Sequence, residues 1–145
     1  MERIKESYPL NGESLPTIPV PHDCVIKRIT LRDQCLEFVF EDHIANHDSI
    51  QYYKPDAKSL ILRYHLTDED DFSIYRWSKP RRPFQKNGKF KQLENRELLS
   101  LPTGKYKLEY LYHNVAYCSI ITKLYANGYV ILDVCADSVE LEWIC

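Results

Sequence analysis

The sequence has little glycine and no long apolar run. With four glycines among 145 residues, it contains no glycine-rich phosphate-binding loop and no Gly-x-Ser-x-Gly nucleophile turn. No stretch approaches the roughly 18 apolar residues of a membrane-spanning helix. The first residues, MERIKESYPL, carry acids and a proline where a secretory signal requires an apolar core. These absences exclude the motif-bearing nucleotide-binding and hydrolase classes, and we expect a cytoplasmic protein.

Cysteine is present but lacks the spacing of a metal or redox motif. The five cysteines are odd in number, include no Cys-x-x-Cys pair and lie mostly in apolar patterns, at Cys24, Cys35, Cys118, Cys135 and Cys145. This arrangement favours reduced, buried thiols over a disulfide framework. We expect Cys118 and Cys135 to lie diagonally on one sheet face, where disulfide geometry is rarely met.

Acidic residues are absent from one segment that is rich in cations. Residues 76–91 (RWSKPRRPFQKNGKFK) hold seven Lys or Arg and no acid, in a chain of formal net charge -2. The remainder has 12 basic and 21 acidic residues, a balance of -9. Such segregation can steer an anionic partner. The predicted binding residues are the cations and aromatic rings Arg76, Trp77, Lys79, Arg81, Arg82, Phe84, Lys86 and Lys89.

Three interpretations of this segment stay open. An acidic protein surface would pair with the cations. Single-stranded nucleic acid or a phosphate-bearing ligand would use the cations for phosphates and the rings for stacking, although a pI near 6.2 is low for a dedicated nucleic-acid binder. The segment could also be a solvated loop without a partner, because two prolines and a glycine interrupt it between residues 80 and 88.

Length and composition predict one β-rich domain. A chain of 145 residues buries enough surface for one core without disulfides. Eleven tyrosines suit half-buried sheet surfaces and also a binding face. Residues 1–21 contain four prolines and no sustained period, so we expect an extended N-terminal arm followed by a single domain over residues 22–145.

Alternating apolar residues predict two hairpins in the first half of the domain. Residues 24–31 and 34–41 are expected to pair around an Arg32-Asp33 turn, with Val25 opposite Phe40, Ile29 opposite Leu36 and Arg28 opposite Glu37. Residues 60–66 and 72–78 form the second predicted hairpin, around an acidic turn. Residues 91–101 are rich in helix formers and predict a short helix.

The last third has the strongest strand pattern. Residues 106–112, 115–125, 129–135 and 139–143 are predicted strands, and Asn127-Gly128 is the preferred two-residue hairpin turn. This turn places Ile121 opposite Val134, with both sheet faces covered. The sequence therefore predicts a mainly β (α+β) fold, an antiparallel β-sandwich or barrel of about seven short strands with one short helix.

The candidates for catalysis and metal binding are weak. His43 and His47 have a spacing that could bind a metal on a helix, but they follow a strand in a polar region. In the sequence His22-Asp23-Cys24, a histidine lies near a thiol, yet neighbours on a strand point to opposite faces, so Asp23 is not expected to orient His22. The acids of residues 68–71 fit a solvated hairpin tip better than a calcium loop.

We therefore expect a small non-enzymatic binding domain for protein–protein interaction, of the inhibitor or immunity type. The second interpretation is nucleic-acid or phospholigand binding through residues 76–91, and the third is a metal-dependent enzyme. No catalytic residue, cofactor or membrane partner is predicted.

Overall fold

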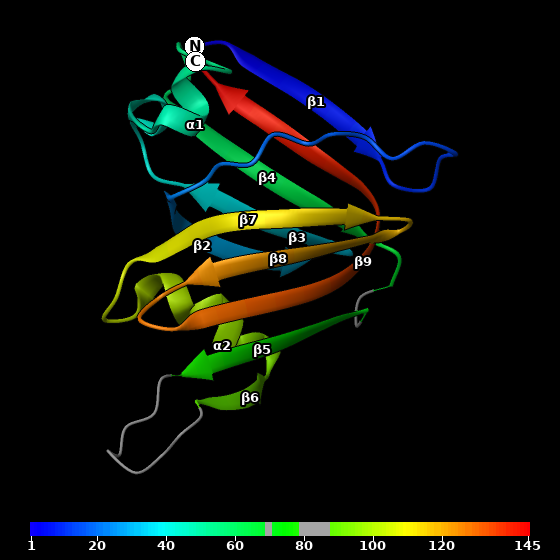
Figure 1. Ribbon diagram of the computed structural model, residues 1–145. Coiled ribbons are helices and arrows are strands. Elements are labelled where there is room, and N and C mark those ends of the chain that lie inside the picture. Colours follow the sequence, from blue (N-terminus) through cyan, green and yellow to red (C-terminus); the bar gives the residue numbers. More distant parts are fainter. Residues whose placement is uncertain (69–70, 79–87) are drawn as a thin grey trace.

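The computed structural model of the chain describes residues 1–68, 71–78 and 88–145. Within these residues the fold is one antiparallel sheet of nine strands with short helical segments (Figure 1). The strands are β1 (Arg3–Pro9), β2 (Cys24–Arg32), β3 (Cys35–Phe40), β4 (Ser59–Leu66), β5 (Phe72–Ser78), β6 (Lys89–Leu93), β7 (Leu108–Ala116), β8 (Ser119–Tyr125) and β9 (Tyr129–Ile144). The helices are α1 (Asp48–Gln51) and α2 (Asn95–Ser100), with 3₁₀ turns η1 (Ile44–Asn46) and η2 (Leu101–Thr103).

Six of the strands pair around a closed circuit. Their order is β4-β3-β2-β7-β8-β9, and pairing of β4 with β9 joins the two ends. The long strand β9 makes this closure. Its first half pairs with β8 and β5, and its second half pairs with β4 and β1. The predicted fold class, an antiparallel β-sandwich or barrel, is confirmed, and the closed circuit is the barrel-like alternative.

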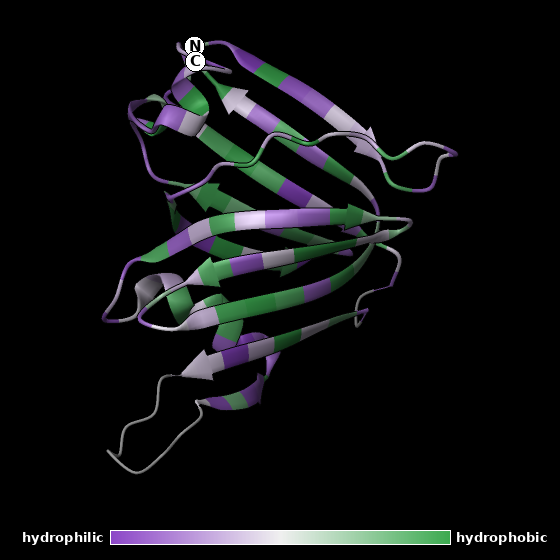
Figure 2. Cartoon of the chain, viewed as in Figure 1, coloured by the Kyte–Doolittle hydropathy of each residue, from purple (hydrophilic) through white to green (hydrophobic). Residues whose placement is uncertain are grey.

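The core lies inside this circuit because apolar residues alternate along its strands (Figure 2). Along β9, Val130, Leu132 and Val134 are fully buried, and Val139, Leu141 and Trp143 continue the pattern after an irregularity. The predicted alternation of residues 139–143 is confirmed. The short helix α2 and the turn η2 pack against β2, and Leu98 of α2 is fully buried.

A chain of hydrogen bonds crosses the core. The Tyr64 hydroxyl lies 2.6 Å from Thr122 Oγ1 and 2.8 Å from the Tyr110 hydroxyl. The Tyr110 hydroxyl lies 2.5 Å from His113 Nδ1, and His113 Nε2 lies 3.1 Å from the carbonyl oxygen of Ile18. His113 is therefore a structural residue with both ring nitrogens partnered.

The outer face of β3, β4, β9 and β1 carries an ion-pair network. The Arg63 guanidinium lies 2.8 Å from Glu37, 2.6 Å from Glu140 and 3.4 Å from Glu142. Glu142, whose side chain is only 4% exposed, also pairs with Arg3 at 3.2 Å. Burial alone would lower the pKa of Arg63, but the surrounding carboxylates raise it. The guanidinium therefore stays charged, and its ion pairs link β3, β4 and β9.

The N-terminal segment is part of the packed domain. Its residues 3–9, within the segment 1–21 that was expected to be an extended arm, form β1, which pairs with β9. Beyond β1 the chain continues over the domain, with Leu10 and Ile18 buried in the core. Proline occurs throughout this segment, but Pro9 lies at the last position of β1, where it does not interrupt the ladder.

The register predicted for the first hairpin is wrong by two residues, because the turn lies one residue further along the chain. The turn residues are Asp33 and Gln34, which have φ of 53° and 58°, the left-handed conformation that tight hairpin turns need. Ile29 therefore lies opposite Phe38, and Arg28 lies opposite Val39. Side chains alternate between the two sheet faces along a strand, so a shift by an even number of residues leaves the same side chains on each face.

A β-bulge near Lys27 changes the start of β2. The register shifts between Ile26 and Arg28, so that Phe40 pairs with Ile26 rather than with Val25. Lys27, which breaks the apolar alternation in the sequence, is the extra residue.

The register predicted for the β8–β9 hairpin is also wrong. Tyr125 pairs with Tyr129 around a three-residue loop, so Ile121 lies opposite Asp133 and Ile120 opposite Val134. Asn127 and Gly128, at φ of 52° and 152°, still form the turn, but Ala126 joins it. Consequently Ile121 is 43% exposed, and the expected covering of both sheet faces is not found here.

Two element boundaries also differ from the prediction. Residues 89–93 form β6, and α2 begins at Asn95 rather than at 91, because Glu94 and Glu97 form a capping box at that point. Residues 115 and 116 belong to β7, which turns into β8 through Tyr117 and Cys118. Within the described residues, no helix is long and apolar enough to cross a membrane.

Candidate binding surface

The outer face of strands β7, β8, β9, β5 and β6 presents a group of aromatic side chains. We call this group the aromatic face, and it consists of Tyr75, Trp77, Phe90, Tyr112, Tyr125 and Tyr129. Strand pairing places Tyr129 between Tyr125 and Trp77, and Trp77 opposite Phe90. Phe90 is 67% exposed, Tyr112 is 42% exposed and Tyr75 is 38% exposed. The face is thus a row of rings running across four neighbouring strands, with further rings beside it.

The rings of this row contact one another. The ring centroids of Trp77 and Tyr129 lie 5.8 Å apart, and those of Tyr125 and Tyr129 lie 5.4 Å apart at an interplanar angle of 61°. The Lys123 ammonium group lies 4.2 Å from the centroid of the Tyr129 ring, a favourable cation–π contact. One face of Tyr129 is therefore covered by Lys123, and its neighbours meet it with tilted rings or edges.

Two glycines permit the close packing around Trp77. A Cβ on Gly128 would lie 2.8 Å from the Trp77 carbonyl oxygen, and the φ of 152° at Gly128 disfavours any side chain. A Cβ on Gly88 would lie 2.5 Å from the Trp77 indole. The Trp77 indole can thus lie against Gly88, and the Trp77 backbone against Gly128 in the β8–β9 turn, only because these positions lack side chains.

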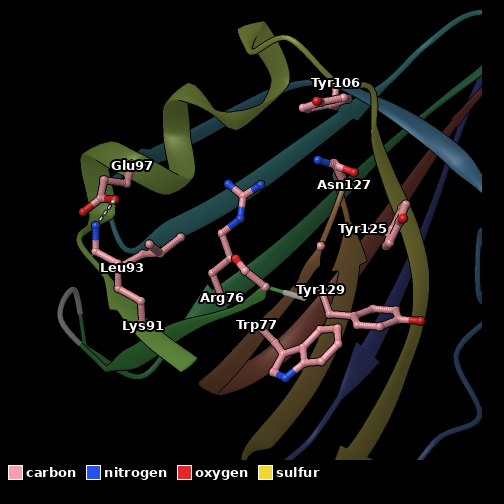
Figure 3. A pocket seen from close by; sticks show the side chains of 11 residues that line it. Arg76, Trp77, Lys91, Leu93, Glu97, Tyr106, Tyr125, Asn127 and Tyr129 are labelled. Atoms are coloured by element: carbon pink, nitrogen blue, oxygen red, sulfur yellow. Dashed lines mark ion pairs between the residues drawn. The ribbon is translucent and has the colours of Figure 1, made fainter. Parts of the chain in front are cut away.

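A cavity of about 670 Å³ adjoins the aromatic face, between β5, β6, α2 and the β8–β9 turn. Arg76 points into it from β5 toward the side where Tyr106 and Asn127 lie, while Trp77 and Tyr129 lie together on the other side (Figure 3). Arg76 Nη2 donates a 2.8 Å hydrogen bond to the Ala126 carbonyl oxygen. The guanidinium group of Arg76 is thus held at the wall of the cavity.

The charge of this cavity is predominantly positive among the described residues. Lys91 lies opposite Arg76 in the β5–β6 ladder, and it pairs with Glu97 at 3.8 Å. Arg76 forms no ion pair with a carboxylate of the described residues. Two cations and one acid therefore surround a space whose volume is within the range of ligand-binding cavities.

Strand pairing brings three of the predicted binding residues together. Arg76 and Trp77 are consecutive on β5, and Lys89 lies opposite Ser78 at the start of β6. The remaining predicted residues, Lys79, Arg81, Arg82, Phe84 and Lys86, lie outside the described residues.

The predicted binding residues did not include the tyrosines that β7, β8 and β9 add to the aromatic face, or Tyr75 of β5. A correct register for the β8–β9 hairpin would have paired Tyr125 with Tyr129, but their place beside Trp77 depends on the pairing of β5 with β9.

The two weak metal candidates lie at the start of short helical segments. His43 precedes η1 with a φ of 63°, and His47 lies between η1 and α1. In residues 1–68, 71–78 and 88–145, no group of three or more His, Cys, Asp or Glu side chains could hold a metal ion.

The arrangement at His22, Asp23 and Cys24 disfavours nucleophilic catalysis. Asp23 has a φ of 66°, so its carboxylate contacts His22 Nδ1 at 3.0 Å, contrary to the expectation for a regular strand. The Cys24 thiol instead faces the His22 carbonyl oxygen at 3.8 Å. Burial raises the pKa of Cys24 to about 12, so the thiol is protonated at neutral pH and is a poor nucleophile.

Of the acidic turn, Asp68 and Asp71 are described. The Thr67 hydroxyl donates a 2.6 Å hydrogen bond to Asp71, which is a contact within the turn.

All five cysteines lie within the described residues and are free thiols. Cys118 lies in the β7–β8 turn with a φ of 51°, rather than in a strand diagonal to Cys135.

No protein-family model, curated protein or solved structure matches this chain. The candidate function therefore depends on the geometry and chemistry of the surface alone.

Proposed function

We propose that this protein is a non-enzymatic binding domain whose partner is a protein with an acidic surface. The observation that supports this proposal is the aromatic face, together with the cations Arg76, Lys89 and Lys91 on the opposite face of β5 and β6. Tyrosine, tryptophan, phenylalanine and arginine are the residue types enriched at the centres of protein interfaces. Exposed rings such as Phe90 and Tyr112 are apolar surface that a partner would remove from water.

The charge distribution favours a partner whose surface carries negative charge. Residues 76–91 carry seven cations and no acid, and the described members Arg76, Lys89 and Lys91 lie on neighbouring strands. A partner with clustered carboxylates would be attracted to the β5–β6 end of the sheet. Complementary charge would raise the association rate and orient the encounter.

One feature favours a protein over single-stranded nucleic acid. Base stacking needs free ring faces, whereas Lys123 covers one face of Tyr129 and Tyr125 packs edge-on against it.

A binding assay with defined polymers tests the proposal. We expect a fluorescent copolymer of glutamate and tyrosine to bind, with affinity that falls as salt rises. Phe90→Ala should weaken binding by about tenfold or more, the effect of a moderate hot spot. Tyr52→Ala is the matched control, because Tyr52 is 99% exposed near α1 and lies away from the aromatic face.

A single-stranded oligonucleotide of equal charge serves as the competing ligand. If the oligonucleotide binds more tightly than the copolymer and loses affinity in Phe90→Ala, the nucleic-acid interpretation replaces this one. If neither polymer binds, the proposal of an acidic partner is wrong.

A further inference from the structure

The edge of β6 is the outermost part of the sheet on the aromatic side (Figure 1). Among the described residues, β6 pairs with β5 alone. Four consecutive residues of β6, from Lys89 to Gln92, are exposed. An edge strand carries backbone N–H and C=O groups directed away from its only neighbour, and an extended segment of another protein can pair with them.

The two faces of this edge differ in chemistry. Phe90 lies opposite Trp77, so it extends the aromatic face to the edge. Lys89 and Lys91 point to the other face because side chains alternate along a strand, and Lys91 lies opposite Arg76. A strand added here would therefore have an aromatic neighbour on one face and cationic neighbours on the other.

We propose that an extended acidic segment of the partner adds to β6 as a further strand of the sheet. This inference rests on the proposed function, because it assumes an acidic protein partner. The carboxylates of the added strand lie beside Lys89 and Lys91, and an aromatic side chain between them lies beside Phe90. Cross-strand pairs of opposite charge and of aromatic rings each stabilise such a ladder.

The charges also exclude competing occupants. Lysines on an edge strand discourage pairing with neutral or basic strands. A second copy of β6 would bring Lys89 and Lys91 beside the lysines of the first, and like charges opposite each other destabilise a strand pair. An acidic strand reverses this effect. The existing pair of Lys91 with Glu97 is exposed, so exchanging it for a partner's carboxylate costs little.

The register gives a sequence for the probe. Read antiparallel from Leu93 to Lys89, the positions call for an apolar residue, a neutral residue, an acid, an aromatic residue and an acid. A labelled peptide with the core Val-Thr-Glu-Tyr-Glu and Gly-Ser flanks meets these requirements. We expect it to bind and to shift the backbone amide resonances of residues 89–93.

Backbone methylation distinguishes strand addition from general charge attraction. In an antiparallel pair only alternate residues direct their N–H groups at the neighbour. Two peptides are compared, one N-methylated at Thr and Tyr and the other at the two Glu residues. We expect one of them to lose binding by at least tenfold and the other to bind as the unmodified peptide does.

A charge exchange provides the second test. The double variant Lys89→Glu with Lys91→Glu should lose the acidic peptide and bind the core Val-Thr-Lys-Tyr-Lys instead. The control is Arg32→Glu with Lys58→Glu, which changes the same charge at two exposed residues that are not part of β5 or β6. This control should retain the acidic peptide and reject the lysine peptide.

The outcomes separate this inference from the proposed function. Equal binding of both methylated peptides would overturn strand addition while leaving the acidic partner in place. Failure of the peptide and of the glutamate–tyrosine copolymer together would overturn both. A protein that dimerises through β6, detected by sedimentation and abolished in the Lys89→Glu and Lys91→Glu variant, would assign the edge to a second copy and overturn the inference.

Discussion

Tyr64 and Thr122 share a 2.6 Å hydrogen bond across the core, although their strands, β4 and β8, do not pair with each other. The Ile18 carbonyl oxygen, at the end of this chain of hydrogen bonds, determines which group donates and which accepts in each of the bonds. The Ile18 carbonyl oxygen can only accept, so His113 Nε2 carries the proton and Nδ1 accepts from Tyr110. Tyr110 then accepts from Tyr64, and Tyr64 accepts from Thr122. The buried groups are all partnered only in this order, with a neutral His113.

Replacing Tyr64 with phenylalanine should destabilise the protein by about 1–3 kcal/mol, the cost of a buried polar group left without a partner. The change leaves Thr122 without its acceptor and Tyr110 without a donor. Urea denaturation followed by tryptophan fluorescence measures the free energy of unfolding. Tyr53→Phe is the control, because its hydroxyl bonds to Glu6 at an exposed position, and it should cost less than about 1 kcal/mol. Equal losses in the two variants would contradict the contribution of this buried chain of bonds to stability.

Stability should fall as the pH is lowered from 7 toward 5, in part because of His113. Burial lowers the pKa of His113 below its ordinary 6.5. As the pH falls through 6.5, the unfolded chain therefore binds a proton at this histidine before the folded protein does, and the free energy of unfolding decreases. Denaturation at several pH values should show a smaller decrease in His113→Gln than in His43→Gln. An unchanged slope in His113→Gln would be inconsistent with this origin.

Removing the Arg63 guanidinium should be more harmful than removing that of Arg3. Glu142 is almost fully buried and contacts both, but Arg63 also holds Glu37 and Glu140. Arg63→Ala leaves three carboxylates close together, and we expect a loss of about 3 kcal/mol. Arg3→Ala removes a side chain that is 57% exposed and should cost under about 1 kcal/mol. Thermal and urea unfolding check both values, and a small effect of Arg63→Ala would show that the network contributes little.

Cys24 should resist alkylation while the protein is folded. Burial raises the pKa of its thiol to about 12, so almost no thiolate exists near neutral pH. Peptide mapping after iodoacetamide treatment at pH 8 should find Cys24 unmodified in the native protein and modified in urea. Rapid labelling of native Cys24 would contradict the burial.

Neighbouring isoleucines on β8 offer a direct test of its register. Ile120 is fully buried, whereas Ile121 is 43% exposed. Ile120→Ala should cost about 2–5 kcal/mol, and Ile121→Ala should change stability by no more than about 0.5 kcal/mol. The register first predicted, with both faces covered, requires a large loss in both variants, and urea denaturation separates the two results.

The sequence predicts the strands better than it predicts their alignment. Alternation of apolar residues is a local property, and it locates most of β2, β3, β4, β5 and β9. Registers depend on turn conformation instead. Nothing in the Arg32-Asp33-Gln34 order requires the left-handed pair at Asp33 and Gln34, and the loop around Asn127-Gly128 gains Ala126 only in the folded hairpin.

The prediction of the candidate surface was affected most by these errors in register. Residues 76–91 were recognisable by charge, but the rings of Tyr125 and Tyr129 join Trp77 only when β5, β8 and β9 are correctly aligned. β5 and β9 are separated by more than 50 residues in sequence, so no local pattern reveals that they are neighbours. The closure of the circuit by β4 and β9 is equally distant, and it was predicted only as a class of architecture.

The 16 residues of β9 have a consequence for biosynthesis. Because β9 pairs with four other strands and is the last of the nine to be synthesised, the sheet cannot close while residues 129–144 are still inside the ribosome. The preceding strands emerge with their core-facing side chains exposed to water, a state that favours aggregation. Non-local pairing of this kind also slows folding. We therefore expect the growing chain to depend on chaperones until β9 has emerged from the ribosome. The complete sheet should then fold and unfold as one cooperative unit.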